Sequence, residues 1–198
     1  MKKSIILIWL AAIFTGIAFL FWHNELVYSL PTPIPKNYKP VTQGSVIYIP
    51  ESLHSKNNKP VLLHFFNPDC PCSKFNITHF KSLVKEYRNE VTFAIVVMNN
   101  RKYTAEQIQN KFDVKIPVLF DTSIATSCGV YSTPQAVIID NNQKLYYRGN
   151  YKRSRYCTDN KSNYAQQALD SLLHDNRPAI FNQFALKAYG CSLPNCSK

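Results

Sequence analysis

The stretch PVLLHFFNPDCPC (residues 60–72) joins a strand-like apolar run to two closely spaced cysteines. The apolar run breaks at Asn67-Pro68-Asp69, as expected where a buried strand ends. Pro71 suits the first position of a helix, because it lacks the N–H group that would have no partner there. Cys70 would then be the N-cap residue, next to unpaired N–H groups that favour the thiolate form. The stretch therefore predicts a reactive thiol at a strand-to-helix junction.

The remainder of the chain alternates between strand-like and helix-like segments. We expect strands at residues 45–49, 60–66, 91–98, 117–120, 136–139 and 144–148, and helices at residues 71–88, 104–112, 123–128 and 163–174. This order predicts an α/β fold, a three-layer sandwich with a mixed central sheet. Right-handed crossovers make the first strands parallel, so ligands and chemistry should gather at their carboxyl ends, where Cys70 lies.

An uncharged apolar segment, SIILIWLAAIFTGIAFLFW, fills residues 4–22. As a helix it could cross about 30 Å of hydrocarbon. Lys2 and Lys3 precede it, which predicts that residues 1–3 lie in the cytoplasm and that the remainder is exported. A cleaved signal peptide is the alternative, but the apolar run exceeds the usual signal core of about 7–15 residues. We therefore expect a single-pass protein of the inner (cell) membrane, with its domain on the periplasmic or extracytoplasmic side.

The exported part divides into three regions. Residues 23–44 contain the proline-rich run PTPIPKNYKP, which predicts a stiff linker. Residues 45–176 have the length of one ordinary domain, and residues 177–198 form a cysteine-containing C-terminal tail. The chain has six cysteines, which in an exported domain indicate an oxidising compartment. Its formal net charge is +11, but for an exported domain we expect no nucleic-acid partner.

Two motifs give the chain a resemblance to the thioredoxin superfamily, particularly to its membrane-anchored bacterial thiol-disulfide oxidoreductases and redoxin-type proteins. They are LHFFNPDCPC (residues 63–72) and YSTPQ (residues 131–135), and the element order between them also matches. The resemblance implies that Cys70 is the attacking cysteine. It also implies that Pro134 is a cis-proline facing Cys70 and that the backbone beside Thr133 and Pro134 holds the partner strand.

The resemblance also suggests a role for His64, six residues before Cys70. Thioredoxins carry a buried acid at this place, which moves protons for the resolving cysteine. Imidazole could do the same, because its ordinary pKa lies close to working pH. A core histidine with satisfied hydrogen bonds is the alternative interpretation.

The motif departs from the family pattern, which is C-x-x-C. Here it is C-x-C followed by Ser73, so Cys72 stands one residue early. We expect Cys72 to resolve the mixed disulfide, with a more distant thiol as the alternative. A Cys70–Cys72 disulfide would close a small, strained ring, which predicts an oxidising or isomerase-like couple if it forms.

The remaining cysteines have less defined roles. We expect a structural disulfide between Cys157 and Cys191, which would fix the tail to the domain. Cys128 is expected to pack in the core, with a role as resolving partner as the alternative.

The sequence thus predicts a membrane-anchored thiol-disulfide oxidoreductase that exchanges disulfides with exported proteins through Cys70 and Cys72, without a cofactor or metal. One alternative is a non-catalytic module with structural disulfides or a copper site, because C-x-C thiolates bind Cu(I) and zinc. Copper-delivery relatives usually have C-x-x-x-C and a later histidine ligand, and this chain lacks that spacing. A thiol peroxidase is less favoured, because Asn67 stands where peroxiredoxins place threonine or serine.

Overall fold

The computed structural model describes residues 2–26, 29–53, 58–99, 102–153, 160–175 and 180–193. The α-helices are α1 (Lys2–Phe21), α3 (Ile77–Tyr87), α4 (Ala105–Phe112), α5 (Ser123–Cys128), α6 (Tyr164–His174) and α7 (Gln183–Leu186). The strands are β1 (Val61–Phe66), β2 (Thr92–Val97), β3 (Val118–Leu119), β4 (Ser132–Thr133), β5 (Gln135–Ile139), β6 (Leu145–Gly149) and β7 (Cys191–Ser192). Short helical turns are η1 (Trp22–Leu26), η2 (Glu51–Leu53), η3 (Pro71–Asn76) and η4 (Asn160–Ser162).

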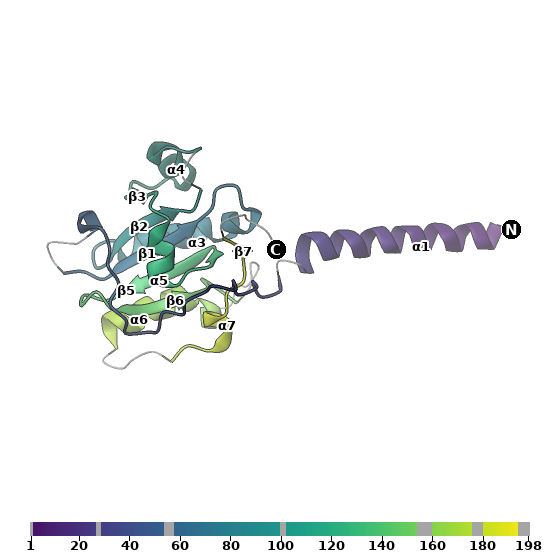
Figure 1. The fold of residues 1–198 in the computed structure, drawn as a ribbon. Helices are drawn as coiled ribbons and strands as arrows, with labels where there is room; N and C mark the ends of the chain where they lie inside the picture. The colour runs from purple at the N-terminus through teal and green to yellow at the C-terminus, as the bar shows by residue number, and fades with distance from the viewer. Residues whose placement is uncertain are drawn as a thin grey trace.

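Five strands form one sheet in the order β3-β2-β1-β5-β6 (Figure 1). β1 runs parallel to β2 and antiparallel to β5. β2 is parallel to β3, and β5 forms an antiparallel hairpin with β6. The sheet is therefore mixed, as the sequence predicts. β4 and β7 form a separate two-stranded ladder.

The central strand β1 sends alternate side chains into two cores. Leu62 and Phe66 pack on one face with residues of α3, α4 and α6. Leu63 and Phe65 pack on the other face with residues of α5. Helices therefore cover both faces of the sheet, which confirms the thioredoxin-like three-layer sandwich.

Local signals in the sequence set several of the element boundaries. α4 begins after Thr104, whose side chain accepts the N–H of Gln107, while the Gln107 side chain accepts the N–H of Thr104. This is a capping box, and it starts the helix that we expect at residues 104–112. The edge strand expected at residues 45–49 is reduced to a single bridge between Val46 and Lys144.

The N-terminal segment stands apart from the domain. Together α1 and η1 form a continuous helix of 25 residues, Lys2–Leu26, with a mean hydropathy of 2.5 in its most apolar part. No residue of α1 is buried, and Figure 1 shows the helix projecting from the body of the protein. This segment is long and apolar enough to cross a membrane.

The linker differs from the free spacer that its prolines suggest. Thr32 is buried, and its N–H donates to the carbonyl of Ala188 at 2.8 Å. The Tyr38 hydroxyl donates to the carbonyl of Gly129 at 2.9 Å. These hydrogen bonds pack the linker against the domain, because its polar groups find backbone partners there.

Candidate functional site

The strand-to-helix junction has the form that the sequence predicts, with one change. Cys70 is the N-cap residue, with extended backbone angles of φ −86° and ψ 124°, and proline follows it at the start of the helix. The first helical segment, η3, is a 3₁₀ helix that leads into α3. The N–H of Ser73 donates to the carbonyl of Cys70 at 3.1 Å, and the Ser73 hydroxyl accepts the N–H of Asn67 at 3.2 Å. The junction is therefore held by hydrogen bonds of its own backbone and of the Ser73 side chain.

Three cysteine sulfurs meet at this junction. The Sγ atoms of Cys70, Cys72 and Cys191 all lie within 4.8 Å of one another. Cys72 and Cys191 form a disulfide across 119 residues of sequence. Cys70 is also disulfide-bonded. All three side chains are buried, with exposures of 0% for Cys70, 7% for Cys72 and 1% for Cys191.

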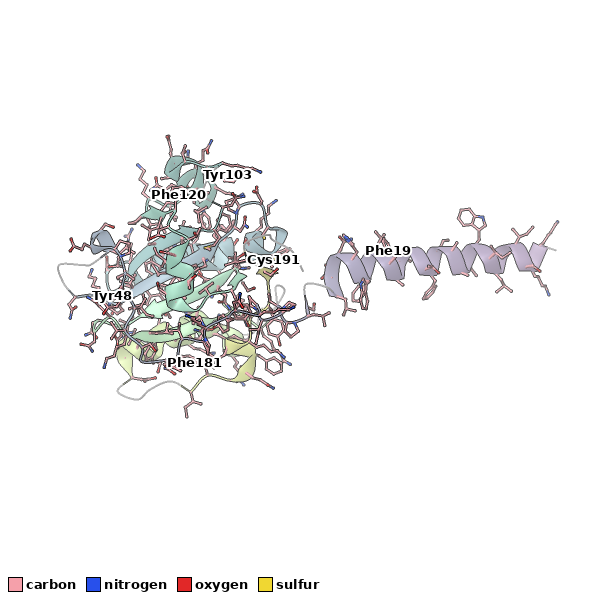
Figure 2. All side chains as sticks on the ribbon, viewed as in Figure 1. Phe19, Tyr48, Tyr103, Phe120, Phe181 and Cys191 are labelled. Carbon is pink, nitrogen blue, oxygen red and sulfur yellow. A yellow bond between two sulfur atoms is a disulfide. The ribbon has the colours of Figure 1, made fainter. Side chains whose placement is uncertain are left out.

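The Cys72–Cys191 disulfide replaces the bridge expected between Cys157 and Cys191. The sequence placed Cys191 in the tail but gave no indication of the strand that carries it back to the junction. Cys157 lies outside the described residues. Figure 2 shows Cys191 on the side of the body from which α1 projects.

A short antiparallel ladder brings Cys191 to the junction. Cys191 pairs with Thr133 and Ser192 pairs with Ser132. The peptide bond between Thr133 and Pro134 is cis, as the resemblance implies. β7 therefore occupies the edge of the segment that the resemblance assigns to a partner strand.

Gly190 allows the tail to approach β4 closely. A Cβ atom on this residue would lie 2.3 Å from the carbonyl oxygen of Thr133 and 2.8 Å from Oγ of Ser132. Real Cβ atoms do not tolerate such distances, so a side chain would force β7 away from β4. Beyond the ladder, the N–H of Leu193 donates to the carbonyl of Tyr131 at 3.1 Å.

Thr32 of the linker forms hydrogen bonds with both sides of the same ladder. Its hydroxyl donates to the carbonyl of Gly190 at 2.9 Å and accepts the N–H of Gly190 at 3.0 Å. It also lies 2.9 Å from Oγ of Ser132. One hydroxyl thus joins the linker, β4 and the tail, with all its hydrogen-bonding capacity used.

Asn150 holds the part of the tail that precedes β7. Its side-chain amide donates to the carbonyls of Phe184 and Lys187 at 2.8 and 2.6 Å. Its side-chain oxygen accepts the N–H of Tyr189 at 3.4 Å. The tail is therefore tied to the domain by hydrogen bonds in addition to the disulfide.

The Asp69 carboxylate is bound by side chains from the segment after β2. Its carboxylate accepts the hydroxyl of Tyr103 at 2.6 Å and a hydrogen bond from the side chain of Asn99. Lys102 lies 3.9 Å from the same carboxylate. The carboxylate thus anchors the loop after β2.

His64 lies in a buried aromatic cluster of the domain core. Its ring stacks on Phe80 with a centroid distance of 4.5 Å and meets Phe112 edge-on. Its Nδ1 shares a 2.6 Å hydrogen bond with the hydroxyl of Tyr151, and its Nε2 has no partner among the described residues. Complete burial lowers the pKa of His64 to about 3, so the ring is neutral at ordinary pH. These surroundings favour a core histidine, and the proton-transfer role stays a prediction.

Cys128 is packed in the core, as expected. It lies in the apolar cluster on the α5 face of the sheet, and it is a free thiol. Burial raises its pKa to about 12, although the charge of Arg148 acts in the opposite direction. A thiol in this state is protonated at neutral pH and is a poor nucleophile.

The sequence analysis does not identify Thr32 or Gly190 as residues that hold the tail against β4. Thr32 lies in a proline-rich run that resembles a spacer. The Gly-Cys dipeptide before Ser192 is the one signal that could have placed the tail near β4, because glycine often marks a close approach of two backbones.

Comparison with known proteins places these observations in a family. A family model described as a domain of unknown function (DUF6436) matches residues 40–194. No curated protein matches the chain by sequence.

Two solved structures share the fold, and a third is similar over a smaller part of the chain. A hypothetical protein from Sinorhizobium meliloti is 16% identical, with a TM-score of 0.63 over 78% of this chain and 94% of that one. An uncharacterized conserved protein from Geobacillus kaustophilus is 20% identical, with a TM-score of 0.57 over 77% and 93%. A putative thiol:disulfide interchange protein DsbE from Chlorobium tepidum is 18% identical, with a TM-score of 0.47 over 55% and 85%.

Proposed function

The chain belongs to the family described as a domain of unknown function (DUF6436), and we propose that it is a membrane-anchored thiol-disulfide oxidoreductase. One observation carries the proposal, which is the gathering of three cysteine sulfurs within 4.8 Å at the carboxyl end of β1. Disulfide exchange proceeds by attack of a thiolate on a neighbouring disulfide sulfur. A cluster of this kind brings the attacking, central and leaving sulfurs into one place.

The proposed roles follow the order of the cysteines in the motif. Cys70 attacks the partner disulfide, and Cys72 resolves the mixed disulfide. The position of Cys70 as N-cap residue supports its role as the attacking cysteine. It lies directly before the first residue of the helix, where a thiolate is favoured. The pairing of Cys72 with a distant cysteine supports the second role, since it shows that Cys72 can reach a sulfur from another segment.

The partner is proposed to lie as an extended strand against Thr133, beside Pro134. The support is the ladder between β4 and β7, which shows that β4 has an edge able to accept an antiparallel strand. Exported proteins with cysteines in extended segments would fit this edge. His64 is proposed to assist proton transfer, as the resemblance implies, with a ring that burial keeps neutral at ordinary pH.

The membrane anchor and the side on which the domain lies are also proposals. α1 and η1 supply the length and apolar character of a membrane span. Lys2 and Lys3 favour a cytoplasmic N-terminus, which would place the domain outside the cytoplasm. Protease added to spheroplasts is expected to digest the domain, and full protection would contradict this orientation.

The same cluster favours a second candidate function, the binding of one soft metal ion. In the reduced protein, Cys70, Cys72 and Cys191 would offer three thiolates, a ligand set that suits Cu(I). A copper-binding module would hold the ion without catalysing exchange. Titration of the reduced full-length protein with Cu(I) against a competing chelator measures this directly.

The catalysed reduction of insulin by dithiothreitol tests the leading proposal. Full-length protein in detergent is expected to raise the rate at least about tenfold, and Cys70→Ser to abolish the increase. Cys128→Ala is the matched control, because this free thiol lies away from the junction, and it should retain the full rate. Equal slow rates for the wild type and Cys70→Ser would contradict the proposal and favour the metal-binding module.

A further inference from the structure

The Cys72–Cys191 disulfide uses a cysteine that lies far outside the C-x-C motif. Cys191 is delivered by a strand, β7, that pairs with β4. An ordinary structural disulfide would need only Cys72 and Cys191, but here the Sγ of Cys70 also lies within 4.8 Å of both. The third sulfur makes exchange within the protein geometrically accessible.

We propose that Cys191 is a third redox cysteine, which takes the disulfide over from Cys70 and Cys72 and so returns Cys70 to its thiol form. This inference rests on the proposed function. It assigns Cys191 a step that follows the reaction with the partner.

The proposed reaction consists of three thiol-disulfide exchanges. The Cys70 thiolate attacks one sulfur of the partner disulfide, and the other partner sulfur leaves as a thiolate. Cys72 then attacks Sγ of Cys70 and expels the second partner thiolate, so that the partner has gained two electrons. Finally, the Cys191 thiolate attacks Sγ of Cys72, forms the Cys72–Cys191 bond and expels the Cys70 thiolate.

No outside oxidant takes part in the last step, because one disulfide is exchanged for another. A dithiol reductant is then needed to return Cys72 and Cys191 to thiols. Since Cys70 is disulfide-bonded in the structure, the cycle starts from protein in which that bond has also been reduced.

The direction of the last step follows from ring size. A Cys70–Cys72 disulfide encloses a single residue, whereas disulfide geometry requires Cα atoms about 4.4–6.8 Å apart with a near-perpendicular torsion. The Cα atoms of Cys72 and Cys191 are 6.6 Å apart, which lies within that range, and their sequence separation of 119 makes a far larger ring. The strained disulfide is the better oxidant, so the disulfide should pass to Cys191.

Hydrogen bonds keep Cys191 within reach when it is a free thiol. Just before β7, Thr32 forms hydrogen bonds with both backbone polar groups of Gly190. Just after β7, the N–H of Leu193 donates to the carbonyl of Tyr131. These contacts do not involve sulfur, so they remain available after reduction. Cys191 would therefore act at high effective concentration, like a tethered second reactant.

β7 lies where the proposed function places the partner strand. The partner and Cys191 must therefore occupy the edge of Thr133 in turn. The return of β7 would displace the reduced partner while Cys191 collects the disulfide.

Mapping of disulfides after a single oxidation tests this inference. Fully reduced full-length protein is mixed with one equivalent of oxidised glutathione, quenched with an alkylating agent at increasing times, and analysed by mass spectrometry. We expect glutathione on Cys70 or a Cys70–Cys72 disulfide first, followed by Cys72–Cys191 with Cys70 alkylated. In Cys191→Ser the Cys70–Cys72 species should accumulate at the times at which the wild type forms Cys72–Cys191, while the rate of the first exchange is unchanged.

Cys128→Ala serves as the control and should give the wild-type pattern. If the wild type reacts with the disulfide while Cys191 stays alkylatable throughout and Cys70–Cys72 persists, the inference is overturned and the proposed function stands. If the reduced wild type does not react with the disulfide at all, the proposed function itself fails. The mapping of the wild type needs no variant, so it decides the matter even if Cys191→Ser does not fold.

Discussion

Cys191 lies directly opposite Thr133 in the antiparallel ladder of β4 and β7, and its sulfur is bonded to Cys72. The tail thus makes a backbone pairing and a covalent sulfur bond at one place. In the proposed function, a partner in a mixed disulfide with Cys70 would likewise combine strand pairing at Thr133 with a sulfur bond at the junction. The ladder therefore serves as an internal model of how a partner would bind.

Removal of the Thr32 hydroxyl should loosen β7 in the reduced protein. Thr32→Val keeps the shape of the side chain but deletes the buried hydrogen bonds to Gly190 and Ser132. Buried polar groups left without partners cost about 1–3 kcal/mol, so β7 should leave β4 more often. We expect the equilibrium constant for forming Cys72–Cys191 against a reference dithiol to fall about tenfold.

Thr42→Val provides the control for this change. Thr42 lies in the same linker, but it is exposed and bonds only to Ser45 in the side-chain contacts described. Its equilibrium constant should match the wild type. An unchanged constant in Thr32→Val would show that these hydrogen bonds do not hold the tail at the junction.

His64 should make the stability of the protein depend on pH. The unfolded chain binds a proton at His64 below about pH 6.5, whereas burial keeps the folded ring neutral down to about pH 3. Stability is therefore fully present above pH 6.5 and decreases as the pH falls towards 3. The limiting slope is about 1.4 kcal/mol per pH unit.

The double variant His64→Phe/Tyr151→Phe should reduce this slope. It keeps the aromatic packing and removes both partners of the 2.6 Å hydrogen bond, so neither is left unsatisfied. Denaturant titrations at pH 7 and pH 5 measure the effect. His79, whose pKa burial and Lys152 lower to about 4, should leave a residual slope in the variant. The same slope in both proteins would mean that His64 does not titrate on unfolding.

Cys128 should be unreactive in the folded protein. Burial raises its pKa to about 12, so almost no thiolate is present at pH 8. Iodoacetamide is expected to label Cys128 only after denaturation, as measured by mass spectrometry of the intact and unfolded protein. Rapid labelling under native conditions would contradict the packing of α5 and return Cys128 to the list of candidate resolving thiols.

The fold, the strand-to-helix junction at Cys70 and the Thr133-Pro134 motif can be predicted from the sequence, because each depends on a strong local pattern. An apolar run broken by Asn67-Pro68-Asp69 determines where β1 ends, and Cys70 with the following proline marks the helix start. The Thr133-Pro134 motif stands just before an apolar strand. Each of these features depends on residues that are neighbours in sequence.

The rest of the site depends on contacts between distant segments. β7 has only two residues, Cys191 and Ser192, which is too short to show the alternation of a strand. Thr32 reaches Gly190 across 158 residues, and its proline-rich surroundings indicate only an extended chain. The pairing of Cys72 with Cys191 follows from these contacts, so cysteine spacing could not reveal it.

The central claim is that Cys70 forms a covalent mixed disulfide with partner cysteines. Capture of that species tests it most directly, with the full-length Cys72→Ser/Cys191→Ser variant, which lacks the proposed resolving thiol and the thiol proposed to take over the disulfide. The reduced variant is mixed with a disulfide-bonded peptide, quenched with acid and analysed by mass spectrometry without reductant. The account predicts one peptide per protein, attached at Cys70 and released by dithiothreitol. No adduct at Cys70, or equal adducts when Cys70→Ser is added to the variant, would contradict it.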